Sequence, residues 1–418
     1  MSRFLYNILV KKLLISLLVI TALAPLAQAL SWQEARAIAD KNNNELISAQ
    51  KSLESTEWSY KKSFSTFLPQ VSASAGMTEN LTSTSTGGAK AYSYGLSATQ
   101  YLFKATEDIY GVQSAYAALE QEKASLKTTQ ANVYYDLFSA YVNLYVAQEN
   151  IKLLEQILAQ RKENTRLIQL RYDSGREDKG NLLTTKADEA AAQYDLASAK
   201  RELSLAKLKL SQLLDSSVDK VEEDFMVLEP SAVDFDQLLK TSPDYLSAQQ
   251  ILELKEINQK AGLSGFLPTV SLSGSYRKSG SDWGSATTTG KSWSFNVSYP
   301  LFTGGSNIAE KIIADLELDS AKQDFAKGVK DLRYSLEENY NNYVDAVESL
   351  SVANTSLAAA SSRAKITQAK YLNGLTTYDE WYRLNNAYIQ GQKSLLSYEK
   401  NALIAEALWH KTYGGYIK

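Results

Sequence analysis

Two different hydrophobic periods alternate along the chain. Apolar residues step by threes and fours through two long stretches, 105–172 and 306–371, which predicts two helices, each on the order of 100 Å long at a rise of about 1.5 Å per residue. Ahead of each long stretch, apolar and polar residues alternate, as they do in strands with one apolar face. In 70–78 and 269–277 the apolar positions of this alternation are Val71, Ala73, Ala75, Met77, Val270, Leu272 and Tyr276. The pattern predicts a molecule that joins short strands to helices too long for a globular core.

The whole order of elements occurs twice, at a constant offset of 199 residues. STFLPQVSAS at 65–74 returns as SGFLPTVSLS at 264–273, and RYDSG at 171–175 returns as KYLNG at 370–374. Because one register holds through helix, hairpin and helix without a gap, the chain is a duplicated architecture rather than a solenoid of short repeats. Each half is predicted to contain a helix (31–65, 234–264), a β-hairpin (68–103, 267–302), the long helix and a returning helix (182–214, 377–412).

The N-terminal segment differs from the rest and predicts secretion. Arg3, Lys11 and Lys12 precede the apolar run LLISLLVITALAPLA, and AQA at 27–29 has the form of a cleavage site. This is typical of a signal peptide that is cleaved before Leu30. The alternative is an uncleaved anchor, for which the run is short compared with about 20 residues. We therefore predict a signal peptide, a first repeat, a linker or equatorial segment and a second repeat, at 1–29, 30–214, 215–233 and 234–418.

Composition removes most kinds of catalytic chemistry. The chain has no Cys, a single His (His410) and a formal net charge of −3. Disulfides and Cys-ligated zinc are excluded, one His makes neither a catalytic triad nor a metal centre, and no basic surplus indicates nucleic acid as a partner. The Gly-rich stretch TSTSTGGAKA lies within the first hairpin rather than between a strand and a helix, so it does not predict a phosphate-binding loop. The sequence therefore predicts no enzyme activity, no cofactor and no metal site.

Four amphipathic strands cannot form a stable object in lipid alone. Every backbone N–H and C=O group needs a partner there, so the sheet has to close, and membrane barrels begin at about eight strands. Two copies of this chain would supply eight strands, three would supply twelve and four would supply sixteen. Aromatic residues near the strand ends fit the girdles at the bilayer interfaces; they are Phe67, Tyr92, Tyr101, Phe103, Phe266, Tyr276, Trp293, Tyr299 and Phe302. A soluble β-sandwich is the alternative, but it does not account for helices of this length.

This order of elements resembles the TolC family of outer-membrane efflux proteins over about residues 31–414. The resemblance rests on the repeated FLP, the LF pairs at 102–103 and 301–302, and the repeated Tyr-containing turn, all after a signal peptide. It implies a membrane α+β fold. It also implies a TolC-like homotrimer, in which the three chains share a twelve-stranded β-barrel that is continued by a long periplasmic α-helical barrel. It also implies the outer membrane of a Gram-negative bacterium, contact with outer-membrane lipid, and two partners: a periplasmic adaptor (membrane fusion) protein and an inner-membrane transporter of the RND or ABC type.

The resemblance also implies where the chain meets its partners. In the family, the turns between the long and returning helices engage the adaptor; here these turns carry Arg171, Tyr172, Gly175, Lys370, Tyr371 and Gly374. The alternative for the two glycines is simple helix capping, which any helical hairpin needs. The family's periplasmic entrance is narrowed by acidic residues after the second turn. Glu380 keeps this character, whereas Arg383 stands where well-known members have an acid, and an ordinary charge at a helix start is the alternative for Glu380.

Two functions of different classes remain to be tested. The first is the outer-membrane channel component of a tripartite efflux pump or type I secretion system, a passive export duct from the periplasm to the exterior. The second is a periplasmic helical scaffold without an open pore. Membrane fractionation and single-channel conductance separate them, because a soluble monomer without conductance excludes the first. The exported substrate stays open among drugs, metals, polysaccharides and proteins.

Overall fold

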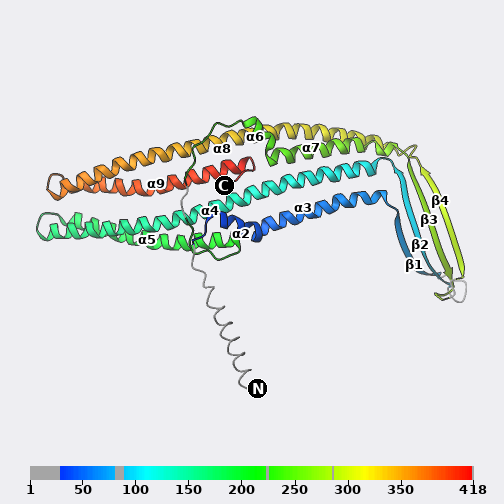
Figure 1. Cartoon of the computed structure of the whole chain (residues 1–418), viewed down its shortest axis with the longest axis horizontal. Helices are drawn as coiled ribbons and strands as arrows, with labels where there is room; N and C mark the ends of the chain where they lie inside the picture. Colours follow the sequence, from blue (N-terminus) through cyan, green and yellow to red (C-terminus); the bar gives the residue numbers. More distant parts are fainter. Residues whose placement is uncertain (1–28, 81–88, 223–225, 285–286, 417–418) are drawn as a thin grey trace, which may run out of the picture.

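The computed structural model describes residues 29–80, 89–222, 226–284 and 287–416. They form a long, narrow molecule with a four-stranded sheet at one end, the tips of two helical hairpins at the other and a short equatorial region between them (Figure 1). In chain order the elements are α2 (Trp32–Asn42), α3 (Asn44–Ser63), η1 (Phe64–Phe67), β1 (Gln70–Asn80), β2 (Ala89–Lys104), α4 (Glu107–Asp173), α5 (Lys179–Leu214), α6 (Phe235–Thr241), α7 (Pro243–Ala261), η2 (Ser264–Phe266), β3 (Thr269–Gly280), β4 (Thr288–Ser298), α8 (Ser306–Leu372) and α9 (Tyr378–Thr412).

Part of the sequence prediction falls outside these residues. The predicted signal peptide, 1–29, lies outside them except for Ala29, and so does most of the Ser/Thr/Gly loop of the first hairpin. None of the helices among the described residues combines the length and the hydrophobicity that a membrane crossing requires.

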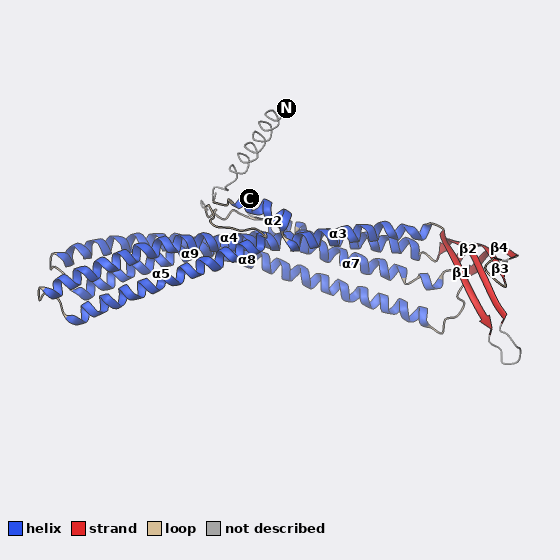
Figure 2. Ribbon diagram, turned by 90° about the horizontal axis from the view of Figure 1, so that it is seen from below, coloured by secondary structure: helices blue, strands red, loops and turns tan. Residues whose placement is uncertain are grey.

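The helices α4 and α8, of 67 residues each, run through most of the molecule. Each turns back into a shorter antiparallel partner, α5 or α9, and the two hairpins lie side by side in one bundle (Figure 2). The predicted ranges 105–172 and 306–371 are confirmed to within two residues at each end. Both helices lack Pro, so nothing interrupts their backbone hydrogen bonds along this length.

The two shorter helices predicted at 31–65 and 234–264 are each split, so the prediction of continuous helices was wrong. Asn43 separates α2 from α3. Its backbone is extended (φ −67°, ψ 118°), and its side-chain oxygen accepts hydrogen bonds from two backbone N–H groups at the start of α3, at 3.0 and 3.1 Å. Ser242 caps α7 in the same way, with Pro243 at the first helical position, where a missing N–H costs little. Local capping therefore overrides the helical period at both positions.

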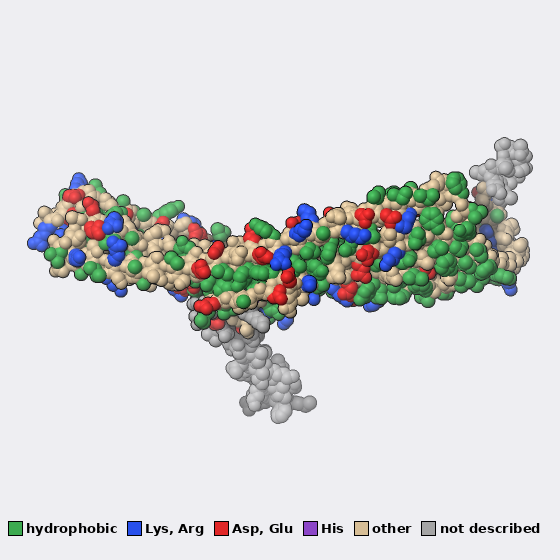
Figure 3. Space-filling view, turned by 90° about the horizontal axis from the view of Figure 1, so that it is seen from above, with side chains coloured by type: hydrophobic (Ala, Val, Ile, Leu, Met, Phe, Trp, Pro, Cys, Tyr) green, Lys and Arg blue, Asp and Glu red, His purple; other side chains and the backbone are tan. Residues whose placement is uncertain are grey.

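The four strands form one antiparallel sheet in the order β1-β2-β3-β4. On one face, the hydroxyl groups of facing serines hydrogen-bond across the strands at 2.7–2.8 Å; the pairs are Ser72–Ser97, Ser273–Ser294 and Ser275–Ser292. The other face is apolar and bare in the single chain: Val71 is 69%, Leu96 55% and Trp293 79% exposed. Hydrophobic side chains gather at this end of the molecule, over the sheet and the adjoining helix ends (Figure 3). Such a face requires an apolar medium or another protein surface to cover it.

The two junctions from strand to long helix have the same backbone but different residues. Ala105 and Thr106 have positive φ angles of 50° and 67°, and the equivalent Gly304 and Gly305 have φ angles of 67° and 88°. Only glycine adopts this left-handed conformation without steric cost. The duplicated turn is therefore strained in the first repeat and relaxed in the second.

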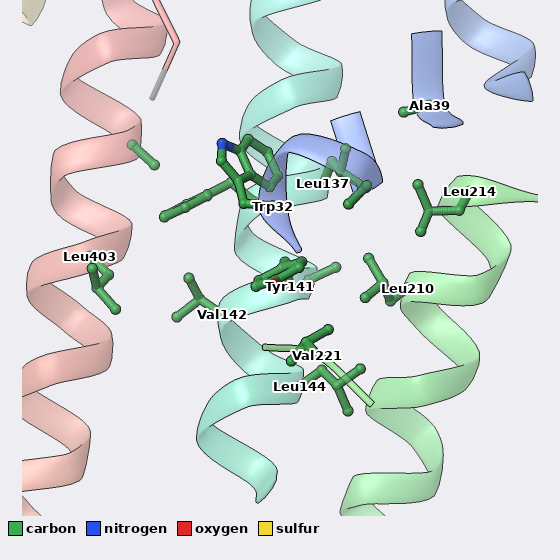
Figure 4. Close-up of a cluster of buried hydrophobic side chains, with 14 residues drawn as sticks. Trp32, Ala39, Leu137, Tyr141, Val142, Leu144, Leu210, Leu214, Val221 and Leu403 are labelled. Atoms are coloured by element: carbon green, nitrogen blue, oxygen red, sulfur yellow. The ribbon is translucent and has the colours of Figure 1, made fainter. Parts of the chain in front are cut away.

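The largest buried cluster lies in the equatorial region. Trp32 of α2 packs edge-on against Phe138 and Tyr141 of α4, with ring centroids 5.0 and 5.9 Å away, and the cluster extends to Leu210 and Leu214 of α5 and to Leu403 of α9 (Figure 4). Each of these apolar side chains gains roughly 1.5–3 kcal/mol by leaving water. The cluster thereby fixes α2 and both arms of the first hairpin to one another.

The same cluster holds the chain at the predicted cleavage site. The N–H of Glu222 donates to the carbonyl of Leu30 at 3.0 Å, and the Tyr141 hydroxyl donates to that carbonyl at 2.6 Å. Gln148 binds both backbone groups of Val221, accepting at 3.1 Å and donating at 3.2 Å. Residue Leu30 is therefore tied to the segment between the two repeats, in the middle of the molecule.

Candidate functional site

The tips of the two helical hairpins carry the residues that the sequence singles out. Each long helix ends in the same turn, with Gly175 at φ 69° and Gly374 at φ 72°. In both, the glycine N–H donates to a carbonyl three residues earlier, at 2.9 and 3.0 Å, and the next N–H donates to a carbonyl five residues earlier, at 2.8 Å. This is the Schellman arrangement. Both glycines therefore cap helices, as the simpler interpretation of the sequence requires.

The returning helices begin with side-chain caps. The Asp178 carboxylate accepts from the N–H of Asn181 at 2.8 Å, and the Thr377 hydroxyl accepts from the N–H of Glu380 at 3.3 Å. Capping residues of this kind contribute about 1 kcal/mol each. The two tips are thus short turns that are fixed at both ends.

The two equivalent tyrosines of the turns have different surroundings. Tyr172 is 37% exposed, whereas Tyr371 is only 2% exposed. Tyr371 lies flat against Trp381 of α9, with ring centroids 4.9 Å apart and 9° between the ring planes. The Arg171 guanidinium carbon, at the end of α4, lies 4.5 Å from the centroid of the Tyr371 ring. Tyr371 therefore joins the two hairpins rather than facing solvent.

The hydroxyl of Tyr371 extends this contact to the opposite turn. It donates to one oxygen of Glu177, and the other oxygen of Glu177 accepts from the side chain of Asn181 at 2.9 Å. The Nε of Arg171 lies 3.9 Å from the same carboxylate, whose side chain is 10% exposed. Burial, with the hydrogen bond to Glu177, raises the pKa of Tyr371 above its usual value. The hydroxyl therefore remains a donor at physiological pH.

A second set of contacts lies further from the tip. Nη1 of Arg161, on α4, lies 3.1 Å from Asp188 on α5, and Nη2 donates to the side chain of Asn386 on α9 at 2.6 Å. The Tyr382 hydroxyl, also on α9, donates to Asp188 at 3.3 Å. The Arg161 and Asp188 side chains are 13% and 23% exposed, so solvent screens these charges less than it screens a surface pair.

We call these two sets of contacts together the hairpin latch. Its members are Arg161, Arg171, Glu177, Asp188, Tyr371, Trp381, Tyr382 and Asn386. All of the residues come from the tip half of α4–α5 or α8–α9. In each set one arginine of α4 contacts both hairpins: Arg161 reaches Asp188 and Asn386, and Arg171 reaches Glu177 and Tyr371.

Outside the latch, the tips expose apolar side chains. Leu170 is 55% exposed, Leu372 52% and Leu375 75%. Lys370 is also exposed. Of the residues predicted to contact an adaptor, Lys370, Tyr172 and the two glycines are thus at the surface, whereas Arg171 and Tyr371 belong to the latch.

The two entrance candidates bind each other. Nη2 of Arg383 lies 2.7 and 2.9 Å from the two oxygens of Glu380, one helical turn away on α9. Both side chains are largely in solvent, 62% exposed for Arg383 and 42% for Glu380. A surface pair of this kind contributes about 0–1 kcal/mol. The main effect of the pair is on charge, because Arg383 neutralises the negative charge of Glu380.

The sequence prediction did not include Trp381, Glu177 or the Arg161 contacts. One signal was available: Tyr378, Trp381 and Tyr382 bring three aromatic rings to the start of α9, whereas the equivalent positions of the first repeat are Lys179, Leu182 and Leu183. A difference between two copies of a repeat indicates a role that only one copy has. The polar partners come from residues 190 or more positions away in sequence, which no local pattern reveals.

Comparisons with known proteins agree with this architecture. The family model described as outer membrane efflux protein matches residues 36–216 and 235–413. Outer membrane protein OprJ of Pseudomonas aeruginosa is 33% identical over 88 residues, a stretch that covers 20% of this chain and 18% of the length of OprJ.

Solved structures of similar fold support the same assignment. The open state of the MtrE outer membrane channel of Neisseria gonorrhoeae superposes with a TM-score of 0.81 at 18% identity, over 92% of this chain and 89% of that one. The outer membrane protein VceC of Vibrio cholerae gives a TM-score of 0.80 at 16% identity, over 93% and 97%. At these identities the similarity establishes the fold, and the predicted TolC-like fold with its internal two-fold repeat is confirmed. Since the family model covers most of the residues in both repeats, the chain belongs to the outer membrane efflux protein family.

Proposed function

We propose that this chain is the outer-membrane channel component of a tripartite efflux pump or type I secretion system. The observation that carries this proposal is the bare apolar face of a four-stranded sheet, joined to helical hairpins that lie entirely on one side of it. Three copies supply the twelve strands of a closed barrel, which satisfies every backbone group in lipid. Membership of the outer membrane efflux protein family supports the same role and a location in the outer membrane.

The helices extend from the barrel into the periplasm and continue the duct. The serine-lined face of the sheet lies inside the barrel, where hydroxyl groups suit a water-filled passage. The chain is a passive conduit, so the energy for export comes from an inner-membrane transporter of the RND or ABC type. The lumen face of the sheet combines serine hydroxyl groups with charged side chains such as Arg277, a mixture that does not identify one class of cargo.

The exposed tip residues form the surface that meets the periplasmic adaptor. Leu170, Leu372 and Leu375 are more than half exposed on otherwise rigid turns, and Tyr172 and Lys370 lie next to them. Exposed apolar side chains on short, capped turns lose little conformational freedom when a partner covers them. Support comes from their position at the end of the molecule farthest from the sheet.

The hairpin latch sets how close the two hairpins lie at the periplasmic end. Widening the entrance requires α8–α9 to part from α4–α5, which breaks the Tyr371–Glu177 and Arg161–Asn386 contacts. Glu380 and Arg383 lie on α9 just behind the tip and form the entrance itself in the trimer. Because Glu380 and Arg383 form a neutral pair in each chain, these two positions add no net charge to the entrance.

Reconstitution tests the main proposal against the alternative, a periplasmic scaffold without a pore. The purified protein should fractionate with the outer membrane, run as a trimer and produce stepwise single-channel currents in a planar bilayer. A water-soluble monomer that produces no current would establish the scaffold instead. For the tip, we expect a cysteine placed at Leu375 to cross-link to a periplasmic adaptor, and a cysteine at exposed Met226 (84% exposed), in the equatorial region, not to do so.

A further inference from the structure

The apolar face of the sheet ends in charged residues toward the loops. When each strand is followed on this face from the helices toward the loops, one charged side chain comes first. These side chains are Glu79 on β1, Lys90 on β2, Lys278 on β3 and Lys291 on β4. Inward of them the face carries Met77, Tyr92, Tyr276 and Trp293. On all four strands the apolar face therefore ends in a charged side chain toward the loops, and three of these four charges are positive.

Two of these charges compensate each other and two do not. Glu79 and Lys90 face each other in register, with their charged atoms 4.0 Å apart. Among the residues that the structure describes, Lys278 and Lys291 have no carboxylate within ion-pair distance. This end of the apolar face thus has an excess of two positive charges in each chain, both on the second hairpin.

The two uncompensated lysines are close neighbours on the sheet. Lys278 on β3 pairs with Thr289 on β4, and Lys291 on β4 pairs with Tyr276 on β3. The two lysines are therefore diagonal neighbours on adjacent strands, two residues out of register. The backbones of such diagonal neighbours are about 7–8 Å apart. Two ammonium groups carried at neighbouring positions repel each other in a medium of low dielectric, unless an anion lies between them.

Their position along the strand places them at the surface of the bilayer. A lysine on the lipid-facing side of a barrel costs about 2–4 kcal/mol at the midplane but about 0–1 kcal/mol near the interface. Aromatic rings mark the interface: the Lys291 ammonium lies 5.8 Å from the centroid of Tyr276, and Trp283 packs on Tyr92 with centroids 5.0 Å apart. Since the helices leave the opposite end of the sheet, this edge belongs to the outer leaflet.

We propose that Lys278 and Lys291 bind a phosphate group of an anionic lipid in the outer leaflet of the outer membrane. The inference rests on the proposed function, which places the apolar face of the sheet in lipid. A phosphate accepts from both ammonium groups at once, relieves their repulsion and needs no geometry beyond two point charges. Each lysine near a charged membrane surface strengthens binding by about fivefold.

Native mass spectrometry of the purified full-length protein tests the site, with lipid A carrying two phosphates as the probe. The Lys278→Gln/Lys291→Gln double variant should bind this lipid about 30-fold more weakly than the wild type. The Arg277→Gln variant is the matched control, because Arg277 lies at the same end of β3 but on the polar face, where it donates to Ser93 at 2.7 Å. It should bind the lipid as the wild type does.

Three outcomes overturn the proposal. The first is unchanged lipid binding by the double variant, the second is an equal loss in the Arg277 control, and the third is complete displacement of the lipid by millimolar inorganic phosphate, which would indicate a site for free anions. Trimer formation and single-channel current are measured on the same samples. We expect both to be unchanged in the double variant; absence of current in the wild type would refute the proposed function, whereas the lipid result alone decides this inference.

Discussion

Replacing Tyr371 with Phe should loosen the hairpin latch while preserving the turn. The substitution keeps the ring that lies 4.9 Å from Trp381 and 4.5 Å from the Arg171 guanidinium, and it removes only the hydroxyl that donates to Glu177. A hydrogen bond to a charged group contributes about 1.5–3 kcal/mol. Since 1.4 kcal/mol is a factor of ten, the equilibrium between latched and parted hairpins should shift toward the parted state by about 10- to 100-fold.

Single-channel recording in planar bilayers measures this shift as the fraction of time spent in the high-conductance state. Tyr172→Phe is the control, because Tyr172 occupies the equivalent position of the first repeat and is 37% exposed instead of 2%. Glu177→Ala should also favour the open state, and the double variant should be no more open than the stronger single variant, since both substitutions remove the same hydrogen bond. Additive effects of the two substitutions, or equal effects of Tyr371→Phe and Tyr172→Phe, would refute the latch.

Three further predictions concern strain, pH and charge. Gly305→Ala should lower the free energy of unfolding by about 1–2 kcal/mol, because φ is 88° at this position; nothing lies within 4 Å of the new Cβ, so backbone strain is the only cost. Thr106→Gly should raise the free energy of unfolding slightly, because it relieves the same strain in the first repeat. Urea denaturation of the detergent-solubilised protein measures both changes. Burial raises the pKa of Glu406 to about 7, above its unfolded value of about 4.5, so protonation of this carboxyl favours the folded state. The stabilisation is therefore lost as pH rises from about 4.5 to 7. Glu406→Gln should flatten that part of the profile of stability against pH, and an unchanged slope would contradict the raised pKa of Glu406. Arg383→Gln frees Glu380 from its pair and should increase cation over anion permeability measured by reversal potential, whereas unchanged selectivity would place the pair away from the passage.

The regular elements could be predicted because their signals are local and repeated. The alternating faces of β1 to β4 and the Pro-free stretches of α4 and α8 are readable in any window, and the 199-residue offset makes each half a check on the other. The breaks at Asn43 and Ser242 were missed for the opposite reason. One capping side chain outweighs a helical period that continues on both sides of it, although Ser242-Pro243 is itself a recognisable helix start.

The site was predicted less well, because its chemistry depends on distance in space. The turn motif located both tips, yet it did not distinguish an exposed Tyr172 from a buried Tyr371. That difference is produced by Trp381 and by Glu177, which comes from the opposite hairpin. The backbone of the turn, which follows from glycine at a left-handed position, is therefore predictable from five residues, whereas the burial of its side chains is not.

The divergence between the two repeats shows how one duplicated backbone can carry a directed function. Where the halves agree, as in the Schellman turns at Gly175 and Gly374, they provide shared geometry. Where they differ, polar or aromatic side chains of one half meet a partner in the other: Tyr371 meets Glu177, while its counterpart Tyr172 remains exposed. A latch between two identical surfaces would also bind either hairpin to itself or to a neighbouring copy. The asymmetry therefore gives the Tyr371–Glu177 contact one orientation, from the second hairpin to the first, which the equivalent Tyr172 does not repeat.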